Sequence, residues 1–287
     1  MERWPVTQRP WLARAASTVR IRARRLLNPL DRLLRSGQPL LPPAHLRIHY
    51  YGSWNLQVFA AACDGARAEL FSHGLRPDHR ILDVGSGIGN LAIGLKDFCR
   101  NGYDGLEIDR ESVEWCQTHI STVYPSFRFH RADVVNAAYN PLGAREPSSY
   151  RFPFADATFD IVYLASVFTH MHPDDVLHYL TQISRLLRPD GMCVASLFLL
   201  NEQSRQGIES GRSFMTFPHR SISDEYRLHD VSRPEAAVAI EESFIQEAYQ
   251  TAGLTIKNIR RGLWWNGTPN DQDVIVSSPS PKEDTPG

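Results

Sequence analysis

The pattern of hydrophobic and polar residues predicts that strands and helices alternate along most of this chain. Runs rich in Val, Ile, Leu, Phe and Tyr have the length of buried strands, and they lie at residues 81–84, 103–108, 127–130, 159–164, 192–200, 254–261 and 273–277. Apolar residues at helical spacing predict helices at residues 53–73, 90–99, 111–123, 173–187 and 234–252. Residues 135–155 and 201–235 fit neither period. The first of these two stretches is rich in aromatic residues, so we expect an ordered loop over the strand ends.

A separate amphipathic pattern precedes this part of the chain. Apolar residues recur at helical spacing from Trp11 to Leu34, with arginines between them, and Pro29 divides the pattern into two predicted helices. Residues 1–36 hold nine Arg against two acidic residues, a net charge of +7 that leaves −8 for the rest of the chain. A basic amphipathic segment is typical of peripheral contact with a membrane, which makes residues 11–35 a candidate for contact with the inner membrane surface. The alternatives are packing on the chain's own domain, a loose state in solution, and an organellar transit peptide, although no cleavage site is evident.

Composition limits the class of protein. The chain has 287 residues, of which 42% are hydrophobic and 22% charged, so we expect one large domain at residues 40–277 after a basic extension at residues 1–39. The Ser/Pro-rich residues 278–287 predict a disordered tail. A formal net charge of −1 provides no global basic field for nucleic acid. The four cysteines form no Cys-x-x-Cys pair and are expected to be reduced core thiols of a cytoplasmic protein. No apolar run approaches the roughly 20 residues that span a bilayer.

A glycine-rich turn follows the first predicted strand. The strand contains Asp83, and Gly85, Gly87 and Gly89 follow it before the helical pattern begins. Such a turn leaves backbone N–H groups beside a helix N-terminus, and without Cβ atoms a ligand can approach that backbone closely. A dinucleotide-binding turn has the spacing Gly-x-Gly-x-x-Gly, but Asn90 stands where its third glycine would be. The turn alone is compatible with either a dinucleotide or a sulfonium nucleoside.

Acidic residues also follow the next two predicted strands. Glu107 comes 22 residues after Gly85, where a carboxylate can accept hydrogen bonds from ribose hydroxyls, whereas Asp109 is expected to cap the next helix. Asp133 follows the third strand, and a role as a turn cap is the alternative to ligand contact. A parallel sheet binds ligands beyond the carboxyl ends of its strands, where all three acidic positions are expected to lie.

Together with Arg188-Pro-Asp-Gly191 before the fifth strand, these motifs resemble those of class I S-adenosylmethionine-dependent methyltransferases. From about residue 40 to 277 the chain is similar to bacterial small-molecule and sugar methyltransferases. The resemblance implies an α/β fold with a doubly wound, seven-stranded, mostly parallel Rossmann-like sheet, and a substrate-binding lid at residues 201–235. It implies S-adenosyl-L-methionine as cofactor, bound by Asp83, Gly85, Ser86, Gly87, Glu107, Ile108, Asp133, Val134 and Ala165. It also suggests that a helix before the first strand covers the cofactor, to which Tyr50, Tyr51 and Trp54 could contribute.

Two histidines after the fourth strand are the candidate catalytic residues. Transfer of a methyl group to oxygen needs a base of nearly neutral pKa, and His is the usual one. His170 is the preferred base, and His172 is the second candidate, although it could simply begin the helix at Pro173. A structural role for His170 is the alternative. The pair could also be considered with Asp174 and Asp175 as metal ligands, but acidic residues are common in the first turn of a helix, so no metal is expected.

The acceptor is open. Residues from Ser166 onward read Ser-Val-Phe-Thr, which lacks the Asn/Asp-Pro-Pro-Tyr/Phe signature of enzymes that methylate nucleobase or glutamine nitrogen. The resemblance therefore favours O-methylation of a small molecule or a glycan, and no nucleic-acid partner is expected. N- or C-methylation of a metabolite, an NAD(P)-linked oxidoreductase and a non-catalytic methyltransferase-like binding protein are the alternatives. The sequence does not indicate an oligomeric state.

Overall fold

The computed structural model describes residues 31, 37–269 and 271–281, which group into two compact units on either side of the Ala144–Arg145 bond. The predicted amphipathic segment at residues 11–35 lies outside the described residues except for Asp31. That residue is buried, and its carboxylate forms an ion pair with the buried Arg47 at 2.6 Å. The predicted domain boundaries stay predictions.

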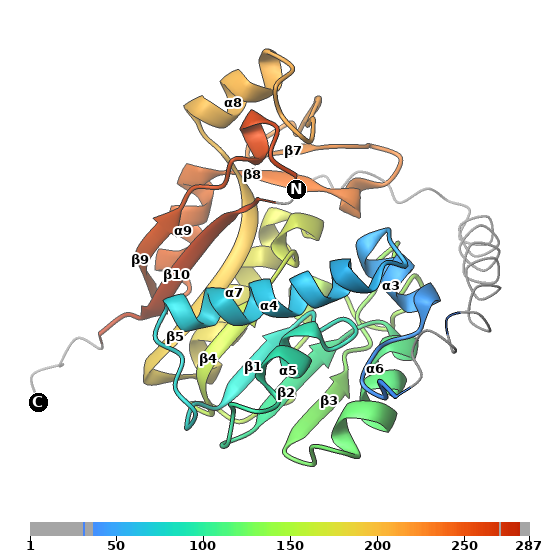
Figure 1. Cartoon of the computed structure of the whole chain (residues 1–287). Helices are drawn as coiled ribbons and strands as arrows, with labels where there is room; N and C mark the ends of the chain where they lie inside the picture. The colour runs from blue at the N-terminus through green and yellow to red at the C-terminus, as the bar shows by residue number, and fades with distance from the viewer. Residues whose placement is uncertain (1–30, 32–36, 270, 282–287) are drawn as a thin grey trace, which may run out of the picture. The chain divides into compact units, whose positions relative to one another are not determined.

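The first unit contains three parallel strands, β1 (Ile81–Val84), β2 (Tyr103–Glu107) and β3 (Phe127–Arg131), with β2 between the other two. Every residue of β1 and β2 is buried, including the acidic residues Asp83, Asp104 and Glu107. The helices are α3 (Ala44–Tyr51), α4 (Leu56–Ser72), α5 (Asn90–Leu95) and α6 (Arg110–Cys116), and α6 continues as a π-turn at Gln117–Ser121. Figure 1 shows α4 crossing in front of β1 and β2.

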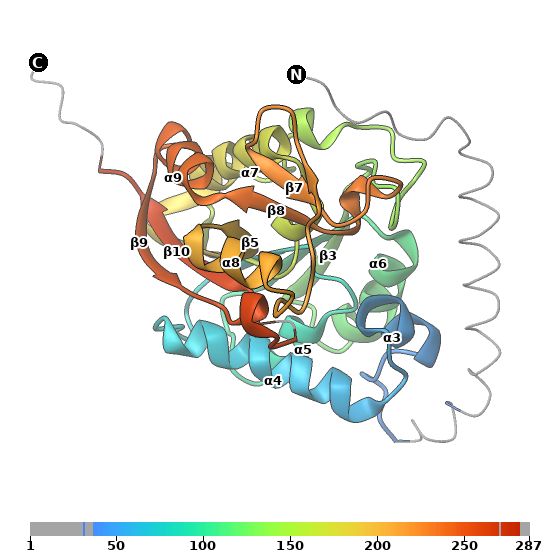
Figure 2. The ribbon, with the colours of Figure 1, turned by 90° about the horizontal axis from the view of Figure 1, so that it is seen from above.

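The second unit is built on β4 (Phe159–Leu164) and β5 (Leu187–Leu200), which are parallel. The antiparallel strand β10 (Asp273–Pro279) lies between β5 and β9 (Leu254–Arg260). Helices α7 (Pro173–Leu186) and α9 (Glu242–Thr251) cover the same side of these strands (Figures 1 and 2). Short 3₁₀ turns lie at Pro147–Ser149, Phe168–His170, Pro234–Ala236 and Trp264–Asn266. The seven predicted strands are therefore present, three in the first unit and four in the second.

The predicted turn at residues 188–191 lies inside β5 as an irregularity. Leu187 pairs with Phe159 and Met192 pairs with Ile161, so extra residues of β5 bulge out of the ladder. The guanidinium of Arg188 closes this bulge by binding both carboxylate oxygens of Asp160, at 2.8 and 2.9 Å. An ion pair between neighbouring strands thus takes the place of a free turn.

The chain between β5 and α9 forms ordered structure that periodicity does not reveal. It contains α8 (Glu202–Glu209), β6 (His219–Arg220), β7 (Tyr226–Leu228) and β8 (Val238–Glu241). The prediction of one helix over 234–252 is wrong in its first half, because residues 238–241 pair with β5 on one side and β7 on the other. Ladder hydrogen bonds and burial of Val238, Ala239 and Ile240 override a local pattern that suits a helix.

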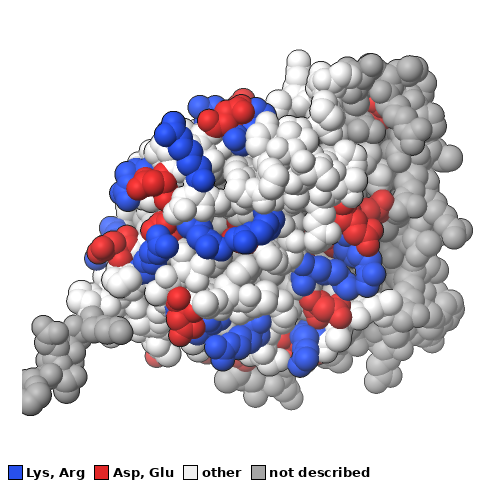
Figure 3. Space-filling model, turned by 90° about the horizontal axis from the view of Figure 1, so that it is seen from below, with Lys and Arg blue, Asp and Glu red and all other residues white. Residues whose placement is uncertain are grey.

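Charges of both signs are interspersed on the face drawn in Figure 3. Lys and Arg side chains lie beside Asp and Glu side chains there and do not form one continuous basic surface among the described residues. Every helix in the described part of the chain is too short or too polar to cross a bilayer.

Candidate functional site

The glycine-rich turn begins at the carboxyl end of β1 in the first unit. The amides of Gly85 and Ser86 donate to the carbonyl oxygen of Leu106, at 2.7 and 3.3 Å, which ties the turn to β2. Gly87 has φ +52° and Gly89 has φ +76°, conformations that residues with a Cβ rarely adopt. A Cβ at Gly89 would lie 2.5 Å from the side chain of Ile120, so this glycine also permits close packing of the turn on the π-turn segment.

Glu107, at the end of β2, is bound to the same turn. One carboxylate oxygen accepts the Gly87 N–H at 2.8 Å, and the other accepts the N–H groups of Ile108 and Asp109 at 2.7 and 2.8 Å. Burial raises the pKa of Glu107 to about 7, although the backbone donors oppose that shift. The carboxylate is therefore held in one orientation and is close to half-ionised at neutral pH. Asp109 caps α6 through the amide of Ser112, as predicted.

Asp83 and Ser86 are buried beneath the turn. The Tyr103 hydroxyl donates to Asp83 at 2.5 Å, and burial raises the pKa of this carboxyl to about 7, with the nearby Glu107 carboxylate adding to the rise. The Ser86 hydroxyl is buried and has no hydrogen-bond partner. An unpaired buried hydroxyl is unfavourable, so this position suits contact with a polar ligand atom.

Asp133 lies two residues beyond β3 and is half-exposed. Its carboxylate pairs with Arg131 at 2.8 Å and accepts from the side-chain amide of Asn140 at 3.3 Å. The same amide also donates to the carbonyl oxygen of Val134 at 2.9 Å. Asn140 therefore holds the segment that is predicted to bind the cofactor. Sequence inspection missed this role because an Asn in a polar loop carries no local signal for the distant residue that it binds.

Aromatic side chains cover the glycine turn. The Tyr50 ring lies 3.0 Å from the position that a Cβ at Gly87 would take, and its centroid lies 5.8 Å from that of Tyr139. His49 makes edge contacts with both tyrosines, at 5.2 and 5.1 Å between ring centroids. Burial raises the pKa of Tyr139, and the Glu107 carboxylate adds to that shift. Of this group only Tyr50 was anticipated; Tyr139 comes from the 135–155 loop, whose partner the sequence does not indicate.

The remaining predicted residues belong to the second unit. Ala165 follows β4 and is exposed, and the next residue, Ser166, has φ +56°. The half-buried His170 donates from Nδ1–H to the carbonyl oxygen of Glu235 at 2.8 Å, which leaves Nε2 as its basic nitrogen. Burial lowers the pKa of His170, so the imidazole is neutral at pH 7. The His172 ring packs edge-on against Tyr226, with centroids 5.3 Å apart.

The cysteines lie in the core. All four cysteines, Cys63, Cys99, Cys116 and Cys193, are free and buried. Within the described ranges, no three His, Cys, Asp or Glu side chains converge as metal ligands. The candidate chemistry therefore lies with the glycine turn and the acidic residues at the strand ends of the first unit, and separately with the histidine segment of the second unit.

Comparison with known proteins identifies this arrangement. Residues 82–195 match the family model of a methyltransferase domain, and this segment includes the glycine turn, all three acidic positions and both histidines. This segment of the chain is therefore similar to the domain of S-adenosylmethionine-dependent methyltransferases. The two units of the chain contain the predicted doubly wound, mostly parallel strands of that fold, with β6, β7 and β8 as additions.

The chain is also similar to several known proteins. It is 33% identical over 121 residues to an O-methyltransferase of Aspergillus nomiae, covering 42% of this chain and 47% of the relative. It is 29% identical over 161 residues to the 27-O-demethylrifamycin SV methyltransferase of Amycolatopsis mediterranei, covering 54% and 53%. The chain thus spans about half the length of these curated relatives. The solved 1,6-didemethyltoxoflavin-N1-methyltransferase of Burkholderia thailandensis, which contains S-adenosylhomocysteine, shares the fold with a TM-score of 0.51, 21% identity and coverage of 86% and 88%.

The residues of the glycine turn are compatible with the nucleoside part of S-adenosylmethionine. The buried Ser86 hydroxyl has no protein partner, and the backbone of the turn is exposed at Gly85, whereas Gly87 is buried under the Tyr50 ring. The Glu107 carboxylate adjoins this backbone and can accept hydroxyl hydrogen bonds when it is ionised. The unpaired Ser86 hydroxyl, the exposed glycine backbone and the oriented carboxylate therefore agree with a nucleoside ligand such as the S-adenosylhomocysteine of the Burkholderia structure.

Proposed function

We propose that the protein is an S-adenosylmethionine-dependent methyltransferase that methylates an oxygen atom of a small-molecule or glycan acceptor. The main support is the Glu107 carboxylate, which is bound to Gly87 of the glycine turn and oriented by three backbone N–H groups. Its position in a segment that matches a methyltransferase domain makes a nucleoside-binding role the simplest explanation for a buried carboxylate.

In this proposal the first unit binds the donor. Glu107 would accept hydrogen bonds from the ribose hydroxyls, and the backbone of Gly85, Ser86 and Gly87 would contact the methionine part. Asp133, held by Arg131 and Asn140, would accept from the adenine amino group, with Val134 against the ring. Ile108 would lie beside the ribose-binding residue, and Asp83 would support the turn from below. Tyr50 would cover the bound nucleoside.

The second unit would supply the acceptor side. S-adenosylmethionine, when bound, supplies an electrophilic methyl group on sulfur. His170 is the proposed base, because its hydrogen bond to Glu235 sets the tautomer and its lowered pKa keeps Nε2 able to take a hydroxyl proton. Ala165 would lie near the reacting methyl group. The ring contact between His172 and Tyr226 favours a packing role for His172 over direct proton transfer.

Oxygen is the proposed acceptor atom because two curated relatives are named as O-methyltransferases or act at an oxygen position. The Burkholderia neighbour is named for methylation at nitrogen, which supports N-methylation as the second candidate. The glycine spacing and the methyltransferase match leave the oxidoreductase alternative without support. The predicted cytoplasmic location and the contact of residues 11–35 with a membrane stay predictions, which co-sedimentation of the full chain with anionic and neutral vesicles tests.

Calorimetry with S-adenosylhomocysteine tests donor binding. We expect the wild type to bind, Glu107→Ala to lose most of the affinity, and Glu114→Ala, an exposed carboxylate on α6, to bind normally. Equal binding by the Glu107→Ala variant would contradict the proposed ribose contact.

Mass spectrometry of a cell extract incubated with isotope-labelled S-adenosylmethionine, with and without the protein, tests catalysis and identifies the acceptor. A label on a hydroxyl oxygen supports the proposal, whereas a label on nitrogen or carbon assigns one of the other methyl-transfer chemistries. Binding of S-adenosylhomocysteine without transfer to any component would support the non-catalytic alternative.

A further inference from the structure

Two arginines lie directly opposite each other on the β6–β7 hairpin. Arg220 on β6 pairs in register with Arg227 on β7, so both side chains project from the same face of this antiparallel pair. A guanidinium is charged at every physiological pH. Like charges directly opposite on neighbouring strands destabilise a sheet, so this pairing needs a compensating interaction.

Arg227 is buried as well as opposed by a like charge. Only 5% of the residue is exposed, its Nε has no hydrogen-bond partner, and no carboxylate among the described residues forms an ion pair with it. Burial lowers its pKa, and the positive charges of Arg220 and Arg205 lower it further, against the weaker opposing effects of Glu241 and Asp224. The electrostatic environment of Arg227 is therefore net positive.

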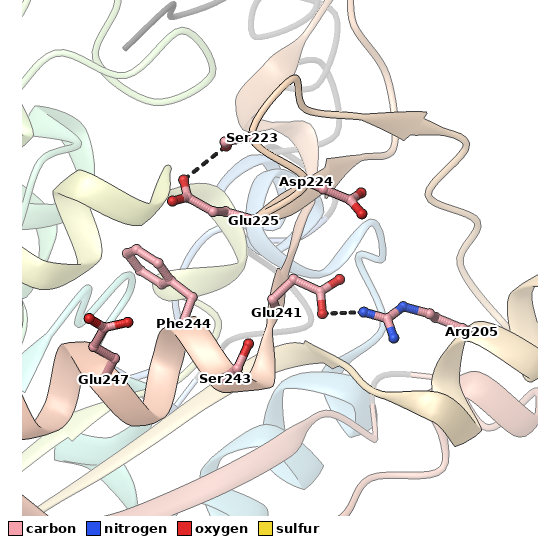
Figure 4. Close-up of a pocket in the computed structure, with 8 residues that line it drawn as sticks. All are labelled: Arg205, Ser223, Asp224, Glu225, Glu241, Ser243, Phe244 and Glu247. Carbon is pink, nitrogen blue, oxygen red and sulfur yellow. Dashed lines mark hydrogen bonds and ion pairs between the residues drawn. The ribbon is translucent and has the colours of Figure 1, made fainter.

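The nearby acidic groups do not neutralise the arginine pair. Glu241 forms its ion pair with Arg205, and Figure 4 shows the two side chains directed toward each other. These two residues line a cleft of about 300 Å³ whose other charged groups, Asp224, Glu225 and Glu247, are all acidic. That cleft suits no anion. Arg205 is already paired, which leaves Arg220 and Arg227 as the uncompensated charges.

Packing alone does not explain the position of Arg227. It lies opposite the fully buried Ala239 of β8, so its aliphatic stem can cover apolar surface there. A methionine of similar length could do the same without burying a charge. The unpaired Nε and the opposing Arg220 are both unfavourable in the free protein, and both become favourable when an anion is bound.

We propose that Arg227 and Arg220 form an oxyanion site, and that its ligand is a carboxylate or phosphate group carried by the methyl acceptor. The planar guanidinium offers paired N–H donors that match both oxyanions. The assignment to the acceptor rests on the proposed function. It is supported by the position of both arginines within residues 201–235, the segment that is expected to form the substrate-binding lid.

Titration calorimetry of the full chain at low salt tests the site, with inorganic phosphate in one arm and acetate in the other. We expect the wild type to bind at least one of them, Arg227→Met to weaken binding at least tenfold, and Arg220→Gln to weaken it severalfold. Arg233→Gln is the matched control, because Arg233 lies in the same segment but is exposed and pairs with Asp230. The arm that binds distinguishes a phosphate from a carboxylate ligand.

Failure of the wild type to bind either anion, or unchanged binding by Arg227→Met, would overturn the site. S-adenosylhomocysteine binding is measured on every variant as a control for folding; if Arg227→Met does not fold, Arg220→Gln decides. If the wild type binds S-adenosylhomocysteine but neither anion, only this site is disproved. If the wild type binds neither S-adenosylhomocysteine nor an anion, the proposed function is refuted as well. A methylated acceptor without an acidic group would overturn the assignment of the anion to the acceptor.

Discussion

The pKa of Glu107 leads to a specific prediction for donor binding. Ribose hydroxyls donate hydrogen bonds to a carboxylate, so S-adenosylhomocysteine should bind the ionised form of Glu107. With a pKa of about 7, roughly one molecule in eleven carries this form at pH 6, and roughly ten in eleven carry it at pH 8. Because apparent affinity scales with the competent fraction, we expect binding to strengthen about tenfold between these pH values.

Two variants separate Glu107 from the other carboxyl that titrates nearby. Glu107→Gln removes the titration, so its affinity should be independent of pH between 6 and 8. It should also be about 10- to 100-fold weaker at pH 8, because hydrogen bonds to a charged group contribute about 1.5–3 kcal/mol. Asp83→Asn removes the other group with a pKa of about 7, and it should keep the pH dependence of the wild type.

Isothermal titration calorimetry at pH 6, 7 and 8, in buffers of matched ionic strength, measures these affinities. Proton release on binding, obtained by repeating the titration in buffers of different ionisation enthalpy, should be greatest near pH 6 and absent in Glu107→Gln. A flat wild-type profile, or a pH dependence that survives in Glu107→Gln and disappears in Asp83→Asn, would refute the assignment of Glu107 as the ribose acceptor.

Three further predictions follow from individual contacts. Gly89→Ala should lower the free energy of unfolding in urea by about 2–5 kcal/mol, because strain in the left-handed region adds to the collision with the π-turn. Gly74→Ala is the control: Gly74 has φ +79° with open space around it, so this variant should lose only the strain energy of about 1–2 kcal/mol. Equal losses in the two variants would count against the packing argument. His170→Ala should reduce kcat by about 10²- to 10⁴-fold with little change in KM. The wild-type rate should persist below pH 6.5, because the pKa of His170 is lowered. If His170→Ala keeps the wild-type rate, another residue is the base. Asp273→Asn should lower the free energy of unfolding by about 1–3 kcal/mol. The Asp273 carboxylate accepts hydrogen bonds from three N–H donors, the Trp264 indole among them, and an amide in its place would turn its NH₂ group toward one of these donors. An unchanged urea midpoint would contradict this reasoning.

The strands at 81–84, 127–130 and 159–164 and the helix at residues 173–187 could be predicted closely because their signals are local. A continuous run of branched and aromatic residues, or an apolar stripe that ends at a proline, indicates an element without knowledge of its neighbours. The glycine turn is also local, since positive φ values at Gly87 and Gly89 favour glycine whatever surrounds them.

Spacing also indicated where acidic residues would gather. Consecutive parallel strands present their carboxyl ends at one edge of a sheet, so Glu107 could be assigned beside the turn from sequence distance alone. The hydrogen bonds of its two carboxylate oxygens and its raised pKa could not be predicted, because they depend on burial and on three backbone N–H donors.

The segment from 201 to 241 shows the opposite case. Residues 238–241 have a pattern that suits a helix, and only pairing with β5 and β7 makes them a strand. The pairing of β6 with β7 places Arg220 opposite Arg227, a relation that no local pattern encodes. Local periodicity and backbone preferences thus determined β1 to β5, β9 and β10, the glycine turn and the positions of its acidic residues. Tertiary structure decided the strand partners beyond β5, the burial of Arg227 and the contact of Glu107 with Gly87, because each depends on packing and pairing that the local sequence pattern does not encode.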